Sequence, residues 1–222
     1  MKRDTRRAIL DMAKTLFSQQ GYNAVSIGEI AGALGISKGN VTYHFKRKED
    51  IMEALLAEAK PTFFQEPPRT MEELDAFLED MEQARENYAF YFQHHAQLGQ
   101  LSPAIRARQQ AIYHSQSALF AQALSILARQ GMFRGEDFPG AYARVADTIF
   151  LTSLYWLPFC AVKGRKEAFR TQAWSVLYPL LTPLGKQRGR ELGLPLLGVG
   201  EIICLPDPAQ EFSIQRLRLD NS

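Results

Sequence analysis

Residues 26–45 read SIGEIAGALGISKGNVTYHF, and they predict two short helices joined by a tight turn. Ser26 and Glu29 have the spacing of a capping box, so the first helix begins there. Gly35 can take the left-handed backbone that ends this helix, and Ser37 can cap the second one. Two short helices joined in this way form a helix-turn-helix, so this stretch determines the expected fold of the N-terminal region.

The second helix carries polar side chains between its buried positions. The apolar residues that can hold the two helices together are Ile30, Ala31, Leu34, Ile36 and Val41. Lys38 can donate to guanine, and Asn40 can pair with adenine through two hydrogen bonds. Thr42 offers a methyl group to thymine and a hydroxyl to phosphate. A short exposed helix with these side chains is expected to enter the major groove of DNA.

Amphipathic helices are predicted on both sides of this motif. Residues 8–17 place apolar side chains at three- and four-residue spacing, and Gly21 follows as a C-cap. After the motif, a helix from Lys48 to about residue 59 can turn Ile51 and Leu55 inward. These helices would complete a small N-terminal domain around the motif.

Positive charge is concentrated at the N-terminal end. Residues 1–48 carry nine basic and three acidic side chains, a net charge of +6. Because the whole chain carries +2, the remaining 174 residues carry −4. A basic end on a mildly acidic chain is typical of a nucleic-acid-binding module. A basic face that is merely solvated would give the same count, so charge alone does not decide between them.

The run from Ala8 to Leu55, above all LGISKGNVTYHFKRKEDIMEAL, resembles the DNA-binding domain of the tetracycline-repressor (TetR) family. The resemblance implies that Tyr43 and His44 lie against phosphates and that Lys48, at the start of the next helix, also meets phosphate. A cation and free backbone N–H groups at a helix N-terminus suit an anion. Asn40-Val41-Thr42 stands where the family commonly has a Thr/Ser-aliphatic-Tyr run, which affects base recognition and not the fold. Alternatively, Tyr43 and Phe45 are only core residues.

Motif and resemblance together predict nine DNA-contacting residues. They are Ser26, Ser37, Lys38, Gly39, Asn40, Thr42, Tyr43, His44 and Lys48.

The rest of the chain has a mostly helical pattern, so the fold class is predicted to be all-α. The predicted helices run from Thr70 to His95, from Ser102-Pro103 to about Gly131, from Pro139 to about Val162 with an end or kink at Pro158, and from Arg165 to about Leu184. The predicted domains are residues 1–47 for the helix-turn-helix, 48–60 for a connecting helix, 61–184 for a larger helical domain and 185–222 for a Gly/Pro-containing tail. Short β-like runs, Leu196–Val199 and Ile202–Leu205, occur in that tail.

By the same resemblance, the larger domain would bind an effector and form a homodimer. Its aromatic density suggests a cavity with a few convergent polar groups, although the aromatics can also fill a solid core. The predicted ligand-binding residues are Tyr88, Tyr91, Phe92, His95, Tyr113, Gln116, Phe120, Phe150 and Trp156. Arg106 and Arg108 either form a solvated face or meet an anionic ligand head.

The last two predicted helices carry apolar stripes that the resemblance assigns to a four-helix dimer interface. Small residues at Ala146, Ser153 and Ala173 would allow close helix approach there. Dimerisation would pair two recognition helices and favour palindromic operators.

Other function classes find little support in the sequence. Neighbouring His94 and His95 point about 100° apart on a helix and, with His114, make a poor metal site. No phosphate loop or nucleophile elbow is present, so neither an enzyme nor a cofactor is expected. No apolar run reaches membrane-spanning length and no secretory signal is apparent. The distant pair Cys160 and Cys204 fits a reducing cytoplasm.

The predicted function is therefore a homodimeric, sequence-specific DNA-binding repressor. A small apolar or aromatic ligand would release it from a palindromic operator. The alternative is a DNA-binding regulator without a small-molecule effector, controlled by a protein partner or acting architecturally.

Overall fold

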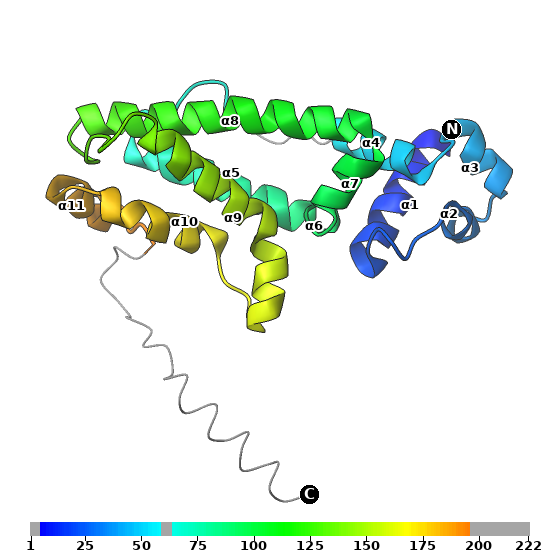
Figure 1. Cartoon of the computed structure of the whole chain (residues 1–222). Helices are drawn as coiled ribbons and strands as arrows, with labels where there is room; N and C mark the ends of the chain where they lie inside the picture. The colour runs from blue at the N-terminus through cyan, green and yellow to red at the C-terminus, as the bar shows by residue number, and fades with distance from the viewer. Residues whose placement is uncertain (1–4, 59–63, 196–222) are drawn as a thin grey trace, which may run out of the picture.

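The computed structural model describes residues 5–58 and 64–195, and all regular structure in those ranges is helical (Figure 1). One isolated antiparallel bridge joins Phe133 to Leu181. The predicted all-α class is confirmed.

The N-terminal region contains the four predicted helices. They are α1 (Thr5–Gln20), α2 (Ile27–Leu34), α3 (Lys38–His44) and α4 (Lys48–Glu58). The predicted capping box is present, because the Glu29 amide donates to the Ser26 hydroxyl and the Glu29 carboxylate accepts from the Ser26 amide. Gly35 ends α2 with a φ of 66°, a left-handed conformation that glycine adopts without strain.

These helices enclose a core of their own. Ile9, Phe17, Ile30, Val41 and Ile51 are buried in it. Phe45 is also buried there, whereas Tyr43 is 85% exposed. The core interpretation therefore holds for Phe45 and is wrong for Tyr43.

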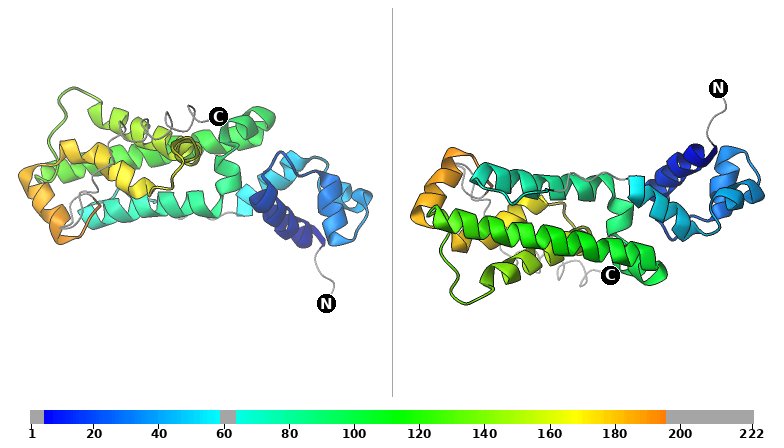
Figure 2. Two further views of the ribbon diagram at one scale, coloured as in Figure 1. Left: turned by 90° about the horizontal axis from the view of Figure 1, so that it is seen from below. Right: turned by 90° about the horizontal axis from the view of Figure 1, so that it is seen from above.

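The larger region begins after the prolines at 67 and 68. Its helices are α5 (Met71–Asn87), α6 (Ala89–Phe92), α7 (His95–Leu101), α8 (Pro103–Arg129), α9 (Ala141–Lys163), α10 (Phe169–Leu177), the 3₁₀ turn η1 (Tyr178–Leu180) and α11 (Pro183–Glu191). Helices α5, α8, α9 and α10 surround a second core that includes Phe77, Phe120, Trp156 and Trp174. Figures 1 and 2 place α1–α4 at one end of an elongated molecule and α11 at the other.

The single helix predicted from Thr70 to His95 is wrong. It breaks at Tyr88, whose φ of −129° and ψ of 35° are not helical, and short α6 follows. Phe90 of α6 is buried in the N-terminal core, with its ring centroid 6.1 Å from that of Phe17. The chain turns because this aromatic is buried against the other region, and tertiary packing overrides the local helical pattern.

The helix predicted from Arg165 to Leu184 is also wrong. Helix α10 begins only at Phe169, whose amide donates to the Glu82 carboxylate. Pro179 lies in η1, and a new helix, α11, starts at Pro183 with Thr182 as its cap. Proline lacks the N–H that continues the helical hydrogen bonds, so Pro179 and Pro183 favour the breaks between α10, η1 and α11.

The predicted tail therefore starts too early, because α11 continues to Glu191 and Leu194 is buried. The β-like runs Leu196–Val199 and Ile202–Leu205 lie outside the described residues.

Helix α9 continues past Pro158 but bends along its C-terminal part, as Figure 1 shows. The predicted kink is confirmed. By length and hydropathy, α9 is the one helix of the described ranges that could cross a membrane, a test that core helices also pass. Ala146, Ile149 and Trp156 bury one face of it against α8 and α10.

Candidate nucleic-acid interface and ligand cavity

Helix α3 presents its polar face to solvent at the end of the molecule. Lys38, Gly39 and Asn40 are exposed. The Ser37 hydroxyl accepts from the Asn40 amide at 3.2 Å and thereby fixes the start of the helix. The Thr42 hydroxyl donates to the Gly39 carbonyl at 3.1 Å, so its methyl group is held in one orientation. A short, capped, exposed helix of this kind can enter a major groove as a rigid unit.

Tyr43 and His44 follow at the end of α3. Their ring centroids lie 5.2 Å apart in an edge-on arrangement. Tyr43 is fully accessible to a partner, and His44 is half-buried.

Lys48 is positioned by Tyr22. Its Nζ donates to the Tyr22 carbonyl at 2.8 Å and lies 4.1 Å from the centre of the Tyr22 ring. Burial lowers the pKa of Lys48. These contacts hold the ammonium group beside the N-terminus of α4, where the helix dipole also favours an anion.

Lys46 and Arg47 were missed as candidates. Both are exposed between α3 and α4. Arg47 is engaged by Asp50, which accepts from its backbone amide and its guanidinium. The adjacent basic residues at 46–48 were the available sequence signal.

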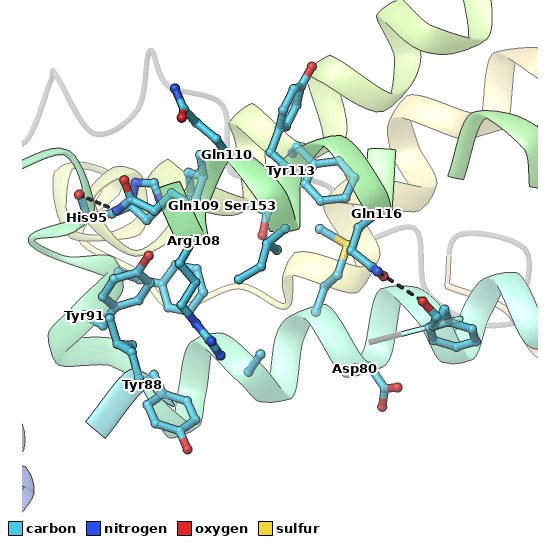
Figure 3. A pocket seen from close by; sticks show the side chains of 18 of the residues that line it. Asp80, Tyr88, Tyr91, His95, Arg108, Gln109, Gln110, Tyr113, Gln116 and Ser153 are labelled. Carbon is cyan, nitrogen blue, oxygen red and sulfur yellow. Dashed lines mark hydrogen bonds between the residues drawn. The ribbon is translucent and has the colours of Figure 1, made fainter. Parts of the chain in front are cut away.

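A cavity of about 340 Å³ lies within the larger region (Figure 3). Its residues come from α4, the segment at Phe64, α5, α6, α7, α8 and α9. They are Leu56, Phe64, Phe77, Asp80, Met81, Ala84, Tyr88, Tyr91, Phe92, His95, Arg108, Gln109, Gln110, Ile112, Tyr113, Gln116, Phe150, Ser153 and Leu154. The volume falls in the range of small-molecule sites.

Seven of the nine predicted ligand residues line this cavity: Tyr88, Tyr91, Phe92, His95, Tyr113, Gln116 and Phe150. Phe120 and Trp156 do not. Phe120 packs in the core behind Phe77, with ring centroids 5.5 Å apart. The Trp156 indole donates to the Glu167 carbonyl and lies against Phe169. Both aromatics occupy positions on α8 and α9 that face the solid part of the bundle.

The cavity wall contains a few fixed polar groups. The Gln109 amide donates to the His95 carbonyl at 2.9 Å, and the Gln116 amide donates to the Phe64 carbonyl at 3.1 Å. Burial lowers the pKa of His95 and raises that of Tyr91 to about 12, so both side chains favour their neutral forms.

Two charged lining residues carry opposite signs. Burial, reinforced by Glu79, raises the pKa of the Asp80 carboxyl group. Arg108 extends from α8 towards α5 (Figure 3), and its charge opposes part of the rise in the pKa of Tyr91 that burial causes. Asp80 was not among the predicted residues, although it shares one face of α5 with Phe77, Met81 and Ala84.

The exposed apolar residues of α9 differ from the predicted dimer stripe. Ala146 and Ala173 are buried in the chain's own core, and Ser153 is buried beside the cavity, so none of the three is available to a partner and this prediction is wrong. The exposed face instead carries Leu151, Tyr155, Phe159 and Val162. The sequence has apolar residues on both sides of α9, so periodicity could not tell which side faces outward.

A helix-turn-helix on a helical domain defines a DNA-binding regulator as the class of this protein. The family described as bacterial regulatory proteins, tetR family, matches residues 9–55, and the one described as bacterial transcriptional repressor, TetR, matches residues 49–188. The chain belongs to the TetR family of transcriptional regulators.

Named transcriptional regulators match this chain over short stretches. The transcriptional regulator AcrR of Shigella flexneri is 52% identical over 48 residues, which are 22% of each protein. QacR of Staphylococcus aureus is 50% identical over 48 residues, 22% of this chain and 26% of QacR. The matched region thus spans about a quarter of these relatives' length.

Solved structures share the fold over both regions. A TetR-family regulator from Marinobacter aquaeolei superimposes with a TM-score of 0.74 at 23% identity, over 86% of this chain and 97% of that one. A regulator from Saccharomonospora viridis, described in complex with choline, gives 0.59 at 22% identity, over 78% and 93%.

Proposed function

We propose that this protein is a homodimeric repressor that binds a palindromic operator and releases it when a small molecule with an apolar or aromatic body fills the cavity. The observation that carries this proposal is the shared role of three lining residues. Leu56, Tyr88 and Tyr91 line the cavity and also pack in or against the N-terminal core. A ligand that contacts these three residues therefore acts on the core that supports the DNA-binding helices.

Two connections can transmit the change. Leu56 belongs to α4, which begins beside α3, and Tyr88 and Tyr91 flank Phe90, which is buried against Phe17. A ligand shifts the equilibrium between two arrangements only if it binds one of them more tightly. Since the coupling is reciprocal, operator DNA would weaken ligand binding by the same factor.

In this proposal, the DNA contacts are made by the nine predicted residues together with Lys46. Asn40 and Lys38 would contact base edges, while Tyr43, His44 and Lys48 would contact phosphates. The exposed stripe of α9, with Tyr155 and Phe159 at its centre, would pair two chains about a two-fold axis. Two recognition helices would then read two half-sites.

Related folds hold small molecules. One neighbour is described in complex with choline, and another, SmeT, in complex with triclosan at a TM-score of 0.54 and 16% identity. These complexes support a ligand role for the cavity. We place the protein in the cytoplasm, where its DNA lies, with a regulatory and not a catalytic role.

The test begins by selecting a tight-binding duplex from random DNA with the purified protein. Titration of that duplex, followed by fluorescence anisotropy, then measures operator affinity with and without aromatic and acyl compounds. We expect at least one compound to weaken DNA binding roughly fivefold or more, the usual scale of allosteric coupling.

A matched variant sharpens the test. Ala84→Phe would fill part of the cavity, so it should retain DNA binding and lose the response to the compound. If every compound leaves operator affinity unchanged, the alternative of a protein-controlled or architectural regulator is favoured instead.

A further inference from the structure

A buried arginine lies directly behind one wall of the cavity. Arg85 of α5 is 1% exposed. Its Nη1 donates to the Met81 carbonyl and to the Ser153 hydroxyl, both at 2.8 Å. Its Nη2 is enclosed and has no hydrogen-bond partner within the described ranges. Met81 and Ser153 themselves line the cavity, so this cation is one side chain away from it.

The charge of Arg85 is not neutralised by a direct ion pair. Within residues 5–58 and 64–195, its guanidinium forms no ion pair within 4.0 Å, and its Cζ lies 3.8 Å from the centre of the Phe169 ring. Glu82 and Glu86 act on this charge only at longer range, and the Glu82 carboxylate accepts from the Phe169 amide. Burial lowers the pKa of Arg85 to about 10, so the group remains a cation at neutral pH. An unpaired buried charge is unfavourable and is relieved by a nearby anion.

Ser153 connects this charge to the cavity. Its oxygen accepts from Arg85, which leaves its own hydroxyl hydrogen available as a donor. The side chain projects from α9 towards the space between α8 and α5 (Figure 3). A hydroxyl that accepts from a cation is a stronger donor to the next group, because linked hydrogen bonds polarise one another.

The cavity wall itself contains two charged side chains and one histidine. Arg108 contributes a second cation from α8. Asp80 is the acidic group of the described wall, and burial raises the pKa of its carboxyl group. His95 is held towards its neutral form, so it adds little charge. The cavity thus combines aromatic walls with two cations, Arg108 in the wall and Arg85 buried behind Ser153, and one acidic group.

From this arrangement we propose that the ligand of the cavity is an amphipathic anion, with an aromatic or apolar body and a carboxylate head group that accepts from the Ser153 hydroxyl over Arg85. This inference rests on the proposed function only in taking the cavity as the effector site. It excludes cationic ligands from this position, because the buried guanidinium would repel them.

Three probes with the same body and different head groups test the inference. Naphthalene-2-carboxylate, 2-naphthylmethanol and 2-naphthylmethylammonium carry negative, neutral and positive charge on one ring system. Calorimetric titration of the full chain should show the carboxylate binding on the order of tenfold more tightly than the alcohol, and the ammonium compound most weakly.

Variants assign the preference to the two residues. Ser153→Ala should reduce the carboxylate-over-alcohol ratio to about one while leaving the alcohol's affinity unchanged within about twofold. Arg85→Met, which keeps an unbranched side chain of similar length, should have the same effect on the ratio. Ser125→Ala on α8 is the matched control, since Ser125 is outside the cavity lining, and should retain the full ratio. Thermal unfolding verifies that each variant is folded. If Arg85→Met does not fold, Ser153→Ala alone is sufficient for the test.

The outcomes separate this inference from the proposed function. Equal binding of carboxylate and alcohol, preference for the ammonium compound, or no binding by any probe would overturn the head-group assignment. Carboxylate-selective binding that depends on Ser153 but leaves operator affinity unchanged would support the assignment and contradict the proposed release mechanism.

Discussion

At the scale of single residues, His95 of the cavity wall is expected to make the stability of the protein depend on pH. Burial holds the pKa of its imidazole below the ordinary value of 6.5. As the pH falls through that value, the unfolded chain takes up a proton that the folded chain resists, so stability decreases. The stability associated with neutral His95 is fully present above the pKa of the unfolded chain. It is lost as the pH falls towards the pKa of His95 in the folded chain.

The free energy of unfolding should therefore decrease between about pH 7.5 and about pH 5.5, and His95→Gln should remove part of that decrease. Urea unfolding followed by circular dichroism measures both. His114→Gln serves as the control, because His114 is exposed and lies outside the cavity lining. An unchanged pH dependence in His95→Gln would refute the role given to this residue.

Substitutions of single residues can also distinguish contacts to DNA bases from contacts to phosphates. If Asn40 pairs with adenine, Asn40→Ala should cost about 1–3 kcal/mol on the selected operator and relax specificity at one position. Tyr43→Phe removes one hydroxyl and should cost about 1 kcal/mol on all duplexes alike. Anisotropy titrations with operator and single-base variants distinguish the two; a uniform loss for Asn40→Ala would argue against base readout.

At the scale of elements, α6 joins the two regions. Phe90 is buried in the N-terminal core although it belongs to a helix beyond α5. Phe90→Ala should reduce the free energy of unfolding by about 3–5 kcal/mol, because it leaves a cavity between α1 and α6. Phe92→Ala is the matched control; Phe92 lines the ligand cavity and is half-buried, so its effect on unfolding should be smaller. Similar losses for both would contradict the anchoring role of α6.

Helix α11 is held against the loop that follows α8 through a glycine. A Cβ added at Gly185 would lie 2.0 Å from the backbone oxygen of Met132, which cannot move away easily. Gly185→Ala should therefore destabilise the chain by about 1–3 kcal/mol in urea unfolding. A Cβ at Gly32, inside α2, meets nothing within 4 Å, so Gly32→Ala should raise stability by roughly 0.5–1 kcal/mol. Equal effects of both substitutions would show that α11 does not pack as described.

At the scale of the whole molecule, dimerisation is expected to depend on the exposed face of α9. Phe159 is 52% exposed on that face, and Phe138, in the segment before α9, is 57% exposed. Phe159→Asp should shift the protein to a monomer in sedimentation velocity and reduce operator affinity on the order of a hundredfold, because two linked half-sites are lost. Phe138→Asp should leave both unchanged. A dimeric Phe159→Asp variant would exclude α9 as the interface.

The extent to which the structure could be predicted from the sequence differs from one part of the chain to another. Caps and turns were predictable: Ser26 with Glu29, Gly35, and Ser102 before Pro103 each act through neighbours in the sequence. The same local pattern, Thr182 before Pro183, indicates the start of α11, but the helix prediction did not make use of it. The break at Tyr88 had no local signal, since its cause is the burial of Phe90 against a distant helix.

The helix-turn-helix of residues 26–45 was determined by the sequence itself, because capping, glycine turns and helical periodicity all act within a few residues. Tertiary structure decided which side of each later helix faces inward. That choice placed Phe120 and Trp156 in the solid core, opened a cavity beside Tyr91 and His95, and set Arg85 behind Ser153. Periodicity specifies that a helix has an apolar face, but the packing partner, a long-range property, determines what that face meets.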